Sequence, residues 1–165
     1  DIMTYEEHIG PIGDACIAWC GDGNNMALTW LQAATLFGFE LRLACPNELS
    51  LDEEDVSYAK EHGAQIFVSD DPISAVKDAD CVVTDTWVSM GGAGALSKLK
   101  ILEPFRVCQS LMRHASPEAI FMHCLPAHRG EEVEASVLEG VQSVVWDEAE
   151  NRLHAQKGLL MWCLS

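Results

Sequence analysis

The sequence predicts a single α/β domain, built as a doubly wound, mainly parallel sheet with flanking helices. Short apolar runs alternate along the chain with longer amphipathic runs, which is the pattern of strands joined by helices. The run Cys81-Val82-Val83 is apolar without alternation, as expected of a strand that is buried on both faces of a parallel sheet. The chain has 165 residues, enough for one domain with a substantial core.

The predicted strands and helices follow one another in alternating order. We expect strands over residues 16–20, 39–45, 65–69, 81–85, 119–124 and 143–146. We expect helices over residues 24–37, 51–62 and 72–79, the first with apolar residues at 3.6-type spacing. Pro46 ends the second strand, and Gly63 is placed to end the second helix. Residues 91–102 begin with a glycine-rich stretch and are therefore predicted to form a mobile loop.

A final helix is predicted over residues 147–164. Asp147 is placed to cap its N-terminus, and Glu150 follows three residues on, as in a capping box. The far end, residues 159–164, is apolar on every side, whereas a helix on a protein surface normally keeps a polar face. We expect this end either to be buried under the domain or to cross onto something outside the chain.

The composition disfavours several classes of partner. The formal net charge is −16, so nucleic acid and anionic membrane surfaces are poor partners. No apolar run reaches the roughly 20 residues needed to span a bilayer, and no basic and apolar leader indicates secretion. The cysteines form no C-x-x-C pair, which disfavours a structural zinc site and favours reduced thiols in a cytoplasmic protein.

Three polar motifs fall at the ends of predicted strands. They are residues 21–25 (GDGNN), residues 85–91 (DTWVSMG) and residues 123–126 (HCLP). In an open α/β sheet, ligands bind in the crevice at the carboxyl ends of the strands. We therefore expect the three motifs to meet at one edge of the sheet.

The GDGNN motif opens a helix. Its glycines let backbone N–H groups approach a ligand, and the helix N-terminus favours an anion such as a carboxylate or a phosphate. The motif is also similar to a dinucleotide fingerprint, but Met26 stands at the third glycine position and the second strand ends in Cys45-Pro46, without an acid for a ribose. A dinucleotide-binding module is therefore an alternative, as is a tight turn that binds nothing.

The second motif supplies an acid. Asp85 can hold an ammonium group, and Ser89 can add a hydrogen bond. The glycines after Met90 would allow this segment to close over a ligand and exclude water. The alternative is that Asp85 only caps the turn that follows it.

The third motif holds a candidate reactive thiol, Cys124. His123 is expected to be a poor base for it, because neighbouring strand residues point to opposite faces. His128 could reach the thiol, but catalysis by a cysteine nucleophile also needs an orienting residue and an oxyanion hole. We disfavour that chemistry, and also a metal site formed by His123, Cys124 and His128. A buried thiol beside a structural histidine stays open.

Together the motifs would place Asn25, Asp85, Ser89 and Cys124 around one crevice. Such a site has donors for a carboxylate, an acid for an amine and a polarisable thiol. This combination suits an amino acid that carries a second amine.

The three motifs, in this order, closely resemble those of the second, Rossmann-like domain of the ornithine carbamoyltransferases. Residues 121–133 (FMHCLPAHRGEEV) and 147–157 (DEAENRLHAQK) resemble the bacterial members, and residues 1–12 resemble the helix that joins the two domains. The resemblance covers residues 1–165 as one ornithine-binding domain. Aspartate carbamoyltransferases look different at the HCLP and SMG motifs, and the substrate of putrescine carbamoyltransferases lacks a carboxylate, so both are disfavoured.

The resemblance implies that the δ-amine of L-ornithine attacks carbamoyl phosphate to give L-citrulline and phosphate, without a metal or an organic cofactor. It also implies which residues hold the amino acid. Asn25 and the backbone at Met90 would bind the carboxylate of ornithine, and Asp85 and Ser89 would bind its α-amine.

The residues implied in catalysis are Asp85, Cys124 and Arg152. Cys124 would lie beside the δ-amine and help to orient and deprotonate it. Arg152, with the backbone of Cys124 and Leu125, would contact the carbamoyl group of carbamoyl phosphate. An attacking amine must be neutral, and donors must meet the carbonyl oxygen as it becomes negative.

The domain that binds carbamoyl phosphate, with its S-T-R-T loop, is implied to lie outside this chain. We therefore expect no turnover by the chain alone, and we expect residues 147–165 to cross to that domain. Members of the family typically form homotrimers, mainly through contacts made by the domain that binds carbamoyl phosphate. Gly92-Ala93-Gly94 replaces the Gln/Glu-rich helix start that is usual in the family. The alternative that this chain is an inert or engineered scaffold derived from the family therefore stays open.

Overall fold

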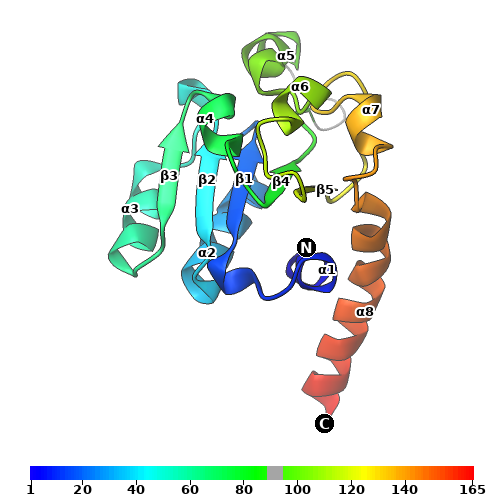
Figure 1. The fold of residues 1–165 in the computed structure, drawn as a ribbon. Helices are drawn as coiled ribbons and strands as arrows, with labels where there is room; N and C mark the ends of the chain where they lie inside the picture. The colour runs from blue at the N-terminus through cyan, green and yellow to red at the C-terminus, as the bar shows by residue number, and fades with distance from the viewer. Residues whose placement is uncertain (89–94) are drawn as a thin grey trace.

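The computed structural model describes residues 1–88 and 95–165. Its centre is a parallel sheet in the order β3-β2-β1-β4-β5 (Figure 1). The strands are β1 (Cys16–Cys20), β2 (Glu40–Ala44), β3 (Ile66–Ser69), β4 (Cys81–Thr84) and β5 (Ile120–His123). Every neighbouring pair of strands is parallel. Because β1 lies between β2 and β4, its Ala18 is opposite Arg42 on one side and Val82 on the other. The predicted doubly wound, parallel α/β fold is confirmed.

Helices cover both faces of this sheet. The α-helices are α1 (Ile2–His8), α2 (Asn25–Phe37), α3 (Glu53–Glu61), α4 (Pro72–Val76), α5 (Ala95–Leu102), α6 (Gln109–Met112), α7 (Ala135–Leu138) and α8 (Val145–Leu164). Short 3₁₀ helices are η1 (Ile12–Asp14), η2 (Asn47–Leu49) and η3 (Glu103–Phe105). One core layer packs α1, α2 and α3 against the sheet, and the other packs α4 to α7 against the opposite face.

Successive residues of each strand fill the two layers in turn. In β1, Ile17 and Trp19 pack into the layer with α2, whereas Ala18 and Cys20 pack into the layer with α4. All four side chains are buried, because β1 lies at the centre of a parallel sheet that is covered on both faces. This explains why the central strands β1 and β4 appear as nearly unbroken apolar runs in the sequence, whereas the edge strand β3 leaves Phe67 and Val68 exposed.

The predicted strand over residues 143–146 was wrong. Ser143 forms one isolated bridge with Phe121 of β5, and the chain enters α8 at Val145. Phe121 N–H donates to the carbonyl of Gln142 and the Phe121 carbonyl accepts from Val144 N–H, so the pairing ends after one residue. Val145 is buried among residues of the α4–α7 layer as the first residue of a helix, not as part of a strand.

Two further predictions near helix ends were wrong. Part of the loop predicted over residues 91–102 is helix α5, whose Leu99 and Leu102 pack into the core at helical spacing. The remainder of that predicted loop falls in residues 89–94, outside the described residues. Asp147 does not cap α8, because the helix already begins at Val145; its carboxylate instead lies 2.9 Å from His8 Nε2 of α1.

Helix α8 has two unlike halves. The first half is held by Val145, Glu148 and Asn151, which are buried on one face. Asn151 Nδ2 donates to Thr4 Oγ1 (3.0 Å) and to Glu7 Oε2 (2.6 Å), which ties α8 to α1.

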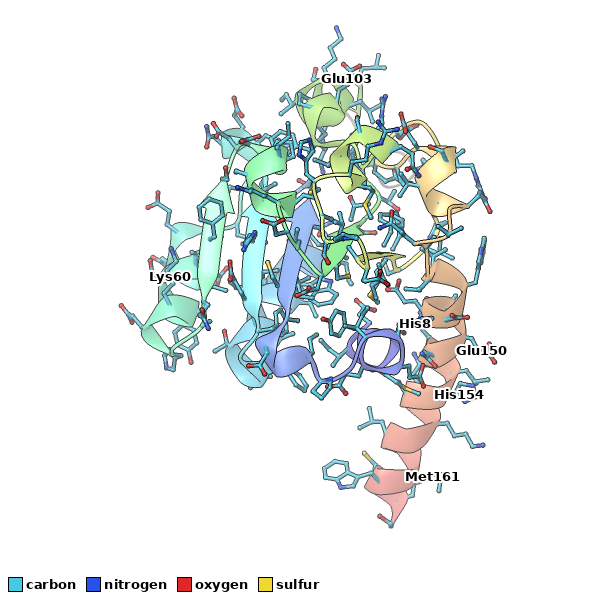
Figure 2. All side chains as sticks on the ribbon, viewed as in Figure 1. His8, Lys60, Glu103, Glu150, His154 and Met161 are labelled. Carbon is cyan, nitrogen blue, oxygen red and sulfur yellow. The ribbon has the colours of Figure 1, made fainter. Side chains whose placement is uncertain are left out.

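The far half of α8, residues 152–164, is exposed throughout. It extends away from the sheet beyond α1 (Figure 1), and Figure 2 shows Met161 on this extension. Its exposed apolar side chains are Leu153, Leu159, Leu160, Met161, Trp162 and Leu164. Of the two expectations for this end, burial under the domain is therefore excluded. Among the described residues, no helix is both long and apolar enough to cross a bilayer.

Candidate active site

The strand order reverses between β1 and β4, and the three motifs follow neighbouring strands at that point. The GDGNN turn comes directly after β1, Asp85 comes directly after β4, and Cys124 comes directly after β5. The carboxyl ends of parallel strands share one edge of the sheet, and a reversal of strand order opens a crevice there. The predicted meeting of the three motifs is thus a consequence of the topology.

The glycines of the first turn are required by close packing. Gly21 has φ +134°, and a Cβ on it would lie 2.9 Å from Nε1 of the buried Trp87. A Cβ on Gly23 would lie 2.5 Å from the carbonyl oxygen of Leu49. The turn is therefore pressed between two segments, and this holds it in place at the start of α2.

Asn24 begins α2 and also reaches the second motif. Its Oδ1 accepts hydrogen bonds from the backbone N–H groups of Met26 (2.9 Å) and Ala27 (3.1 Å), an N-cap of the usual kind. Its Nδ2 donates to Asp85 Oδ2 at 2.9 Å. Sequence reasoning missed this role of Asn24, although its place before an apolar helical run is a recognisable capping signal.

Asp85 is the centre of the site. Its Oδ1 accepts from Thr86 N–H (2.7 Å) and from the thiol of Cys124 (3.3 Å), while Oδ2 accepts from Asn24. Thr86 Oγ1 in turn donates to the carbonyl of Pro126 at 2.7 Å. We call Asn24, Asp85, Thr86 and Cys124 the Asp85 cluster. It joins all three motifs through one half-buried carboxylate.

The Cys124 thiol is held in its protonated form. Burial raises the pKa of Cys124 to about 12, with the negative charge of Asp85 as the next cause. A thiol of this kind is a hydrogen-bond donor at neutral pH and not a thiolate nucleophile. The raised pKa of Cys124 therefore argues against catalysis by a cysteine nucleophile, which the sequence also disfavoured.

His123 lies directly behind Cys124 and is fully buried. Its Nδ1 accepts from Leu125 N–H at 2.9 Å, so its proton is on Nε2, which lies 3.3 Å from Glu132 Oε1. The backbone N–H of His123 donates to Glu148 Oε2 of α8 at 2.9 Å. These bonds fix the backbone on both sides of Cys124.

The expectation that His123 and Cys124 face apart was wrong. A ring nitrogen of His123, the Cys124 sulfur and an Asp85 oxygen lie within 4.8 Å of one another. The strand alternation ends at His123, and Leu125 takes a positive φ of 52°, so the chain turns at once.

The sequence did not predict the two buried acids that hold this turn, Glu132 and Glu148. Each lies in a run of acidic residues, and such a run is typical of a solvent-exposed surface.

The remaining predicted site residues are placed less closely. Asn25 is exposed at the first position of α2, and Arg152 is exposed at the start of the far half of α8. Within residues 1–88 and 95–165, neither side chain bonds to the Asp85 cluster. Ser89 and Met90 lie outside the described residues.

The charge beside the site is balanced by a lysine. Lys98 Nζ of α5 lies 2.5 Å from Asp22 Oδ2 in the GDGNN turn, where Asp22 is largely buried. Without this partner, Asp22 would repel an anion at the start of α2. This edge of the sheet can thus present backbone N–H donors at the start of α2 to a carboxylate and the Asp85 carboxylate to an amine.

Comparison with known proteins gives a consistent match. The family model described as aspartate/ornithine carbamoyltransferase, Asp/Orn binding domain, matches residues 13–163. The chain is 55% identical over 163 residues to an ornithine carbamoyltransferase of Rhodopseudomonas palustris, covering 99% of this chain and 52% of that protein. It is 53% identical over 164 residues to the ornithine carbamoyltransferase of Nitrobacter winogradskyi, covering 99% of this chain and 53% of that protein.

Solved structures agree with these relatives. The ornithine carbamoyltransferase of Pyrococcus furiosus superposes with a TM-score of 0.89 at 46% identity, over 96% of this chain and 52% of that one. The enzyme of Burkholderia thailandensis gives a TM-score of 0.86 at 49% identity, over 97% and 51%. The chain therefore spans about half the length of the relatives that it matches.

Proposed function

This chain belongs to the aspartate/ornithine carbamoyltransferase family, and we propose that it is the ornithine-binding half of an ornithine carbamoyltransferase. The complete enzyme would convert carbamoyl phosphate and L-ornithine to L-citrulline and phosphate. The observation that carries the proposal is the Asp85 cluster, a half-buried carboxylate at the reversal point of the sheet with a protonated thiol against it.

The charge of the cluster favours ornithine over aspartate. Asp85 would attract an ammonium group, whereas a second substrate carboxylate in the same crevice would be repelled by it. Lys98, which borders the GDGNN turn, is already paired with Asp22. An amino acid with a second amine therefore suits the site better than one with a second carboxylate.

We assign the binding roles in line with this charge. The N-terminus of α2, with Asn25, would receive the ornithine carboxylate, because unpaired backbone N–H groups and the helix dipole favour an anion there. Asp85 would bind the α-amine, with Ser89 and the backbone at Met90 completing the pocket.

In the reaction, the lone pair of the δ-nitrogen would attack the carbonyl carbon of carbamoyl phosphate. The bond from that carbon to the phosphate oxygen would break, phosphate would leave with the electron pair, and the nitrogen would lose a proton. Cys124 would orient the δ-amine through its sulfur. Asp85, which already accepts from that thiol, would be the acceptor toward which the proton moves.

The backbone around Leu125 would recognise the carbamoyl group. The carbonyl oxygens of Cys124 and Leu125 would accept hydrogen bonds from the carbamoyl amino group, whereas the N–H of Leu125 already donates to His123 Nδ1. Arg152 would stabilise the carbonyl oxygen as it becomes negative. Holding the two substrates in line would supply much of the remaining rate enhancement.

The other half of the enzyme would complete the site. We propose that residues 1–12 join the two domains and that the far half of α8 crosses onto the domain that binds carbamoyl phosphate. The exposed apolar end of α8 supports this, since large apolar patches on a surface mark contacts with something else. We further propose a cytoplasmic enzyme, in keeping with seven free cysteines, and a trimer formed mainly through that other half.

A titration followed by NMR tests the binding assignment. L-Ornithine should shift the amide signals of Asn24, Asn25 and Asp85 saturably, while L-aspartate should shift none of them. Putrescine, which has both amines but no carboxylate, should bind more weakly than ornithine. If aspartate shifted the same signals as strongly as ornithine, the choice of substrate would be wrong. If no ligand shifted them at millimolar concentration, an inert scaffold would be the better account of this chain.

A further inference from the structure

The turn that follows the HCLP motif gathers three ligating side chains. Glu131 N–H donates to the His128 carbonyl (3.0 Å) and Gly130 N–H donates to the Val133 carbonyl (2.8 Å), which closes the turn. Gly130 has φ +88°, a conformation that other residues rarely adopt. As a result, His128 Nδ1 lies 3.9 Å from Glu131 Oε2 and 3.9 Å from Glu132 Oε2.

Glu132 is an unusual member of this group because it is fully buried. Its Oε1 is used twice, by His123 Nε2 and by the backbone N–H of His128. Its Oε2 has no hydrogen-bond partner among the described residues, and neither has the buried Nδ1 of His128. A buried carboxylate oxygen without a partner is costly, and a separation of 3.9 Å is too long for a hydrogen bond between the two.

We propose that His128, Glu131 and Glu132 bind a divalent transition-metal cation, with Zn²⁺ as the best match. Their three ligand atoms lie within 4.8 Å of one another. Ligands at roughly 2.0–2.2 Å from one zinc ion lie about 3.4 Å apart in tetrahedral geometry. The side chains of His128 and Glu131 are each 42% exposed, so small rotations of these two close the difference. An imidazole with two carboxylates suits zinc or manganese better than calcium or magnesium.

The surroundings meet the other needs of a metal site. His123 Nε2 and the His128 N–H hold Glu132 in place from behind, as hydrogen-bonded neighbours commonly do for metal ligands. The side chains of His128 and Glu131 are half-exposed, so the group lies close to the surface of the molecule. Because Glu132 also contacts His123, a bound ion would stabilise the turn that carries Cys124 and Leu125.

A second group, Asp85, His123 and Cys124, also has metal-ligand spacing. Its donor atoms are already occupied, since the Cys124 thiol donates to Asp85 and His123 Nδ1 accepts from Leu125 N–H. Burial also raises the pKa of Cys124 to about 12, which opposes the thiolate that a metal needs. The His128 group is therefore favoured over this one.

Zinc titration of the whole chain tests the proposal, with calorimetry for stoichiometry and thermal unfolding for stability. One ion should bind per chain, and a hundredfold excess of zinc over the dissociation constant should raise Tm by roughly 5 °C or more. His128→Asn and Glu131→Gln should each weaken binding at least tenfold. Both side chains are half-exposed, so the Tm of the metal-free variants should stay close to that of the parent.

Two control variants separate this site from the others. His154 lies 3.7 Å from Glu150 on the surface of α8 (Figure 2), so His154→Asn removes an exposed His–Glu pair of similar kind and should leave zinc binding unchanged. Cys124→Ser should also leave it unchanged. In NMR spectra, Mn²⁺ should broaden the amide signals of residues 128–133 first. The proposal would be overturned if His128→Asn bound zinc as tightly as the parent chain, or if Cys124→Ser abolished zinc binding. It would also be overturned if the parent chain bound no zinc at millimolar concentration.

Discussion

The Asp85 cluster and the far half of α8 are opposites in the same small domain. In the cluster, polar groups are half-buried and bonded to one another across three strands. In the far half of α8, apolar side chains stand in solvent without cover. The Asp85 cluster is held together by bonds within this chain's own fold. The far half of α8, by contrast, presents apolar side chains that no described part of this chain covers.

The two regions each contain a cysteine, and these should differ most strongly in reactivity. With a pKa of about 12, Cys124 is ionised to only about one part in ten thousand at pH 8, whereas a free thiol of pKa near 8.5 is about one quarter ionised. Alkylation of Cys124 by iodoacetamide should therefore be about two-thousandfold slower than that of a free thiol, and should accelerate about tenfold per pH unit.

Mass spectrometry of the alkylated chain measures this, with the exposed Cys163 as the reference site. Asp85→Asn should increase the rate at Cys124, because the Asp85 charge is one cause of its raised pKa. Equal rates at the two cysteines at pH 8 would contradict the description of Cys124 as a protonated donor.

The two halves of α8 should differ next, in their contribution to stability. Glu148→Ala removes the acceptor for the buried His123 N–H and should destabilise the fold by about 2 kcal/mol, which lowers Tm by about 4–8 °C. Leu160→Ala in the far half should change stability by less than about 0.5 kcal/mol. Thermal unfolding of both variants measures the contrast, and a larger loss for Leu160→Ala would mean that the far half of α8 is covered in solution.

Within the site, Asp85→Asn should weaken ornithine binding by about 10- to 100-fold. The change keeps the shape of the side chain but removes the charge that would hold the α-amine, and hydrogen bonds to charged groups contribute about 1.5–3 kcal/mol. The matched control is Asp71→Asn, which alters an N-cap of α4 that asparagine can also make. Calorimetry of both variants decides the point, and equal affinities would remove Asp85 from the binding site.

The smallest effect concerns the pH dependence at Glu148. Burial raises the pKa of this carboxyl above its usual value in the folded chain, so the folded state favours its protonated form. Its stabilising contribution is therefore fullest below pH 4.5 and falls as pH rises through the folded pKa. Glu148→Gln cannot ionise, so its Tm relative to that of the parent should increase between pH 4 and pH 7. A constant difference across this range would exclude the raised pKa.

Much of the fold follows from local patterns, while the errors arise where distant contacts decide. The strand at Cys81 to Thr84 and the motifs at strand ends were predictable, because a parallel sheet requires apolar runs and places its ligand crevice at their ends. Residues 144–146 also form an apolar run, yet Val145 packs as part of a helix. Burial among neighbouring elements overrides local propensity there.

The site shows the same limit. Asp85 and Cys124 could be identified from the motifs in which they lie, and they do meet. The supporting acids Glu132 and Glu148 could not, since the sequence does not reveal that these members of acidic runs face inward to His123. Roles of this kind depend on a turn and on a helix that approach from elsewhere in the fold.

The most direct test of the central claim joins this chain to the half of its relatives that it does not span. The first half of the Rhodopseudomonas palustris ornithine carbamoyltransferase, fused ahead of residues 1–165, should form L-citrulline from L-ornithine and carbamoyl phosphate. This chain alone should form none, and Asp85→Asn in the fusion should lose most of the activity. A folded fusion that makes no citrulline, while the parent enzyme does under the same conditions, would contradict the assignment of this chain as the ornithine-binding half.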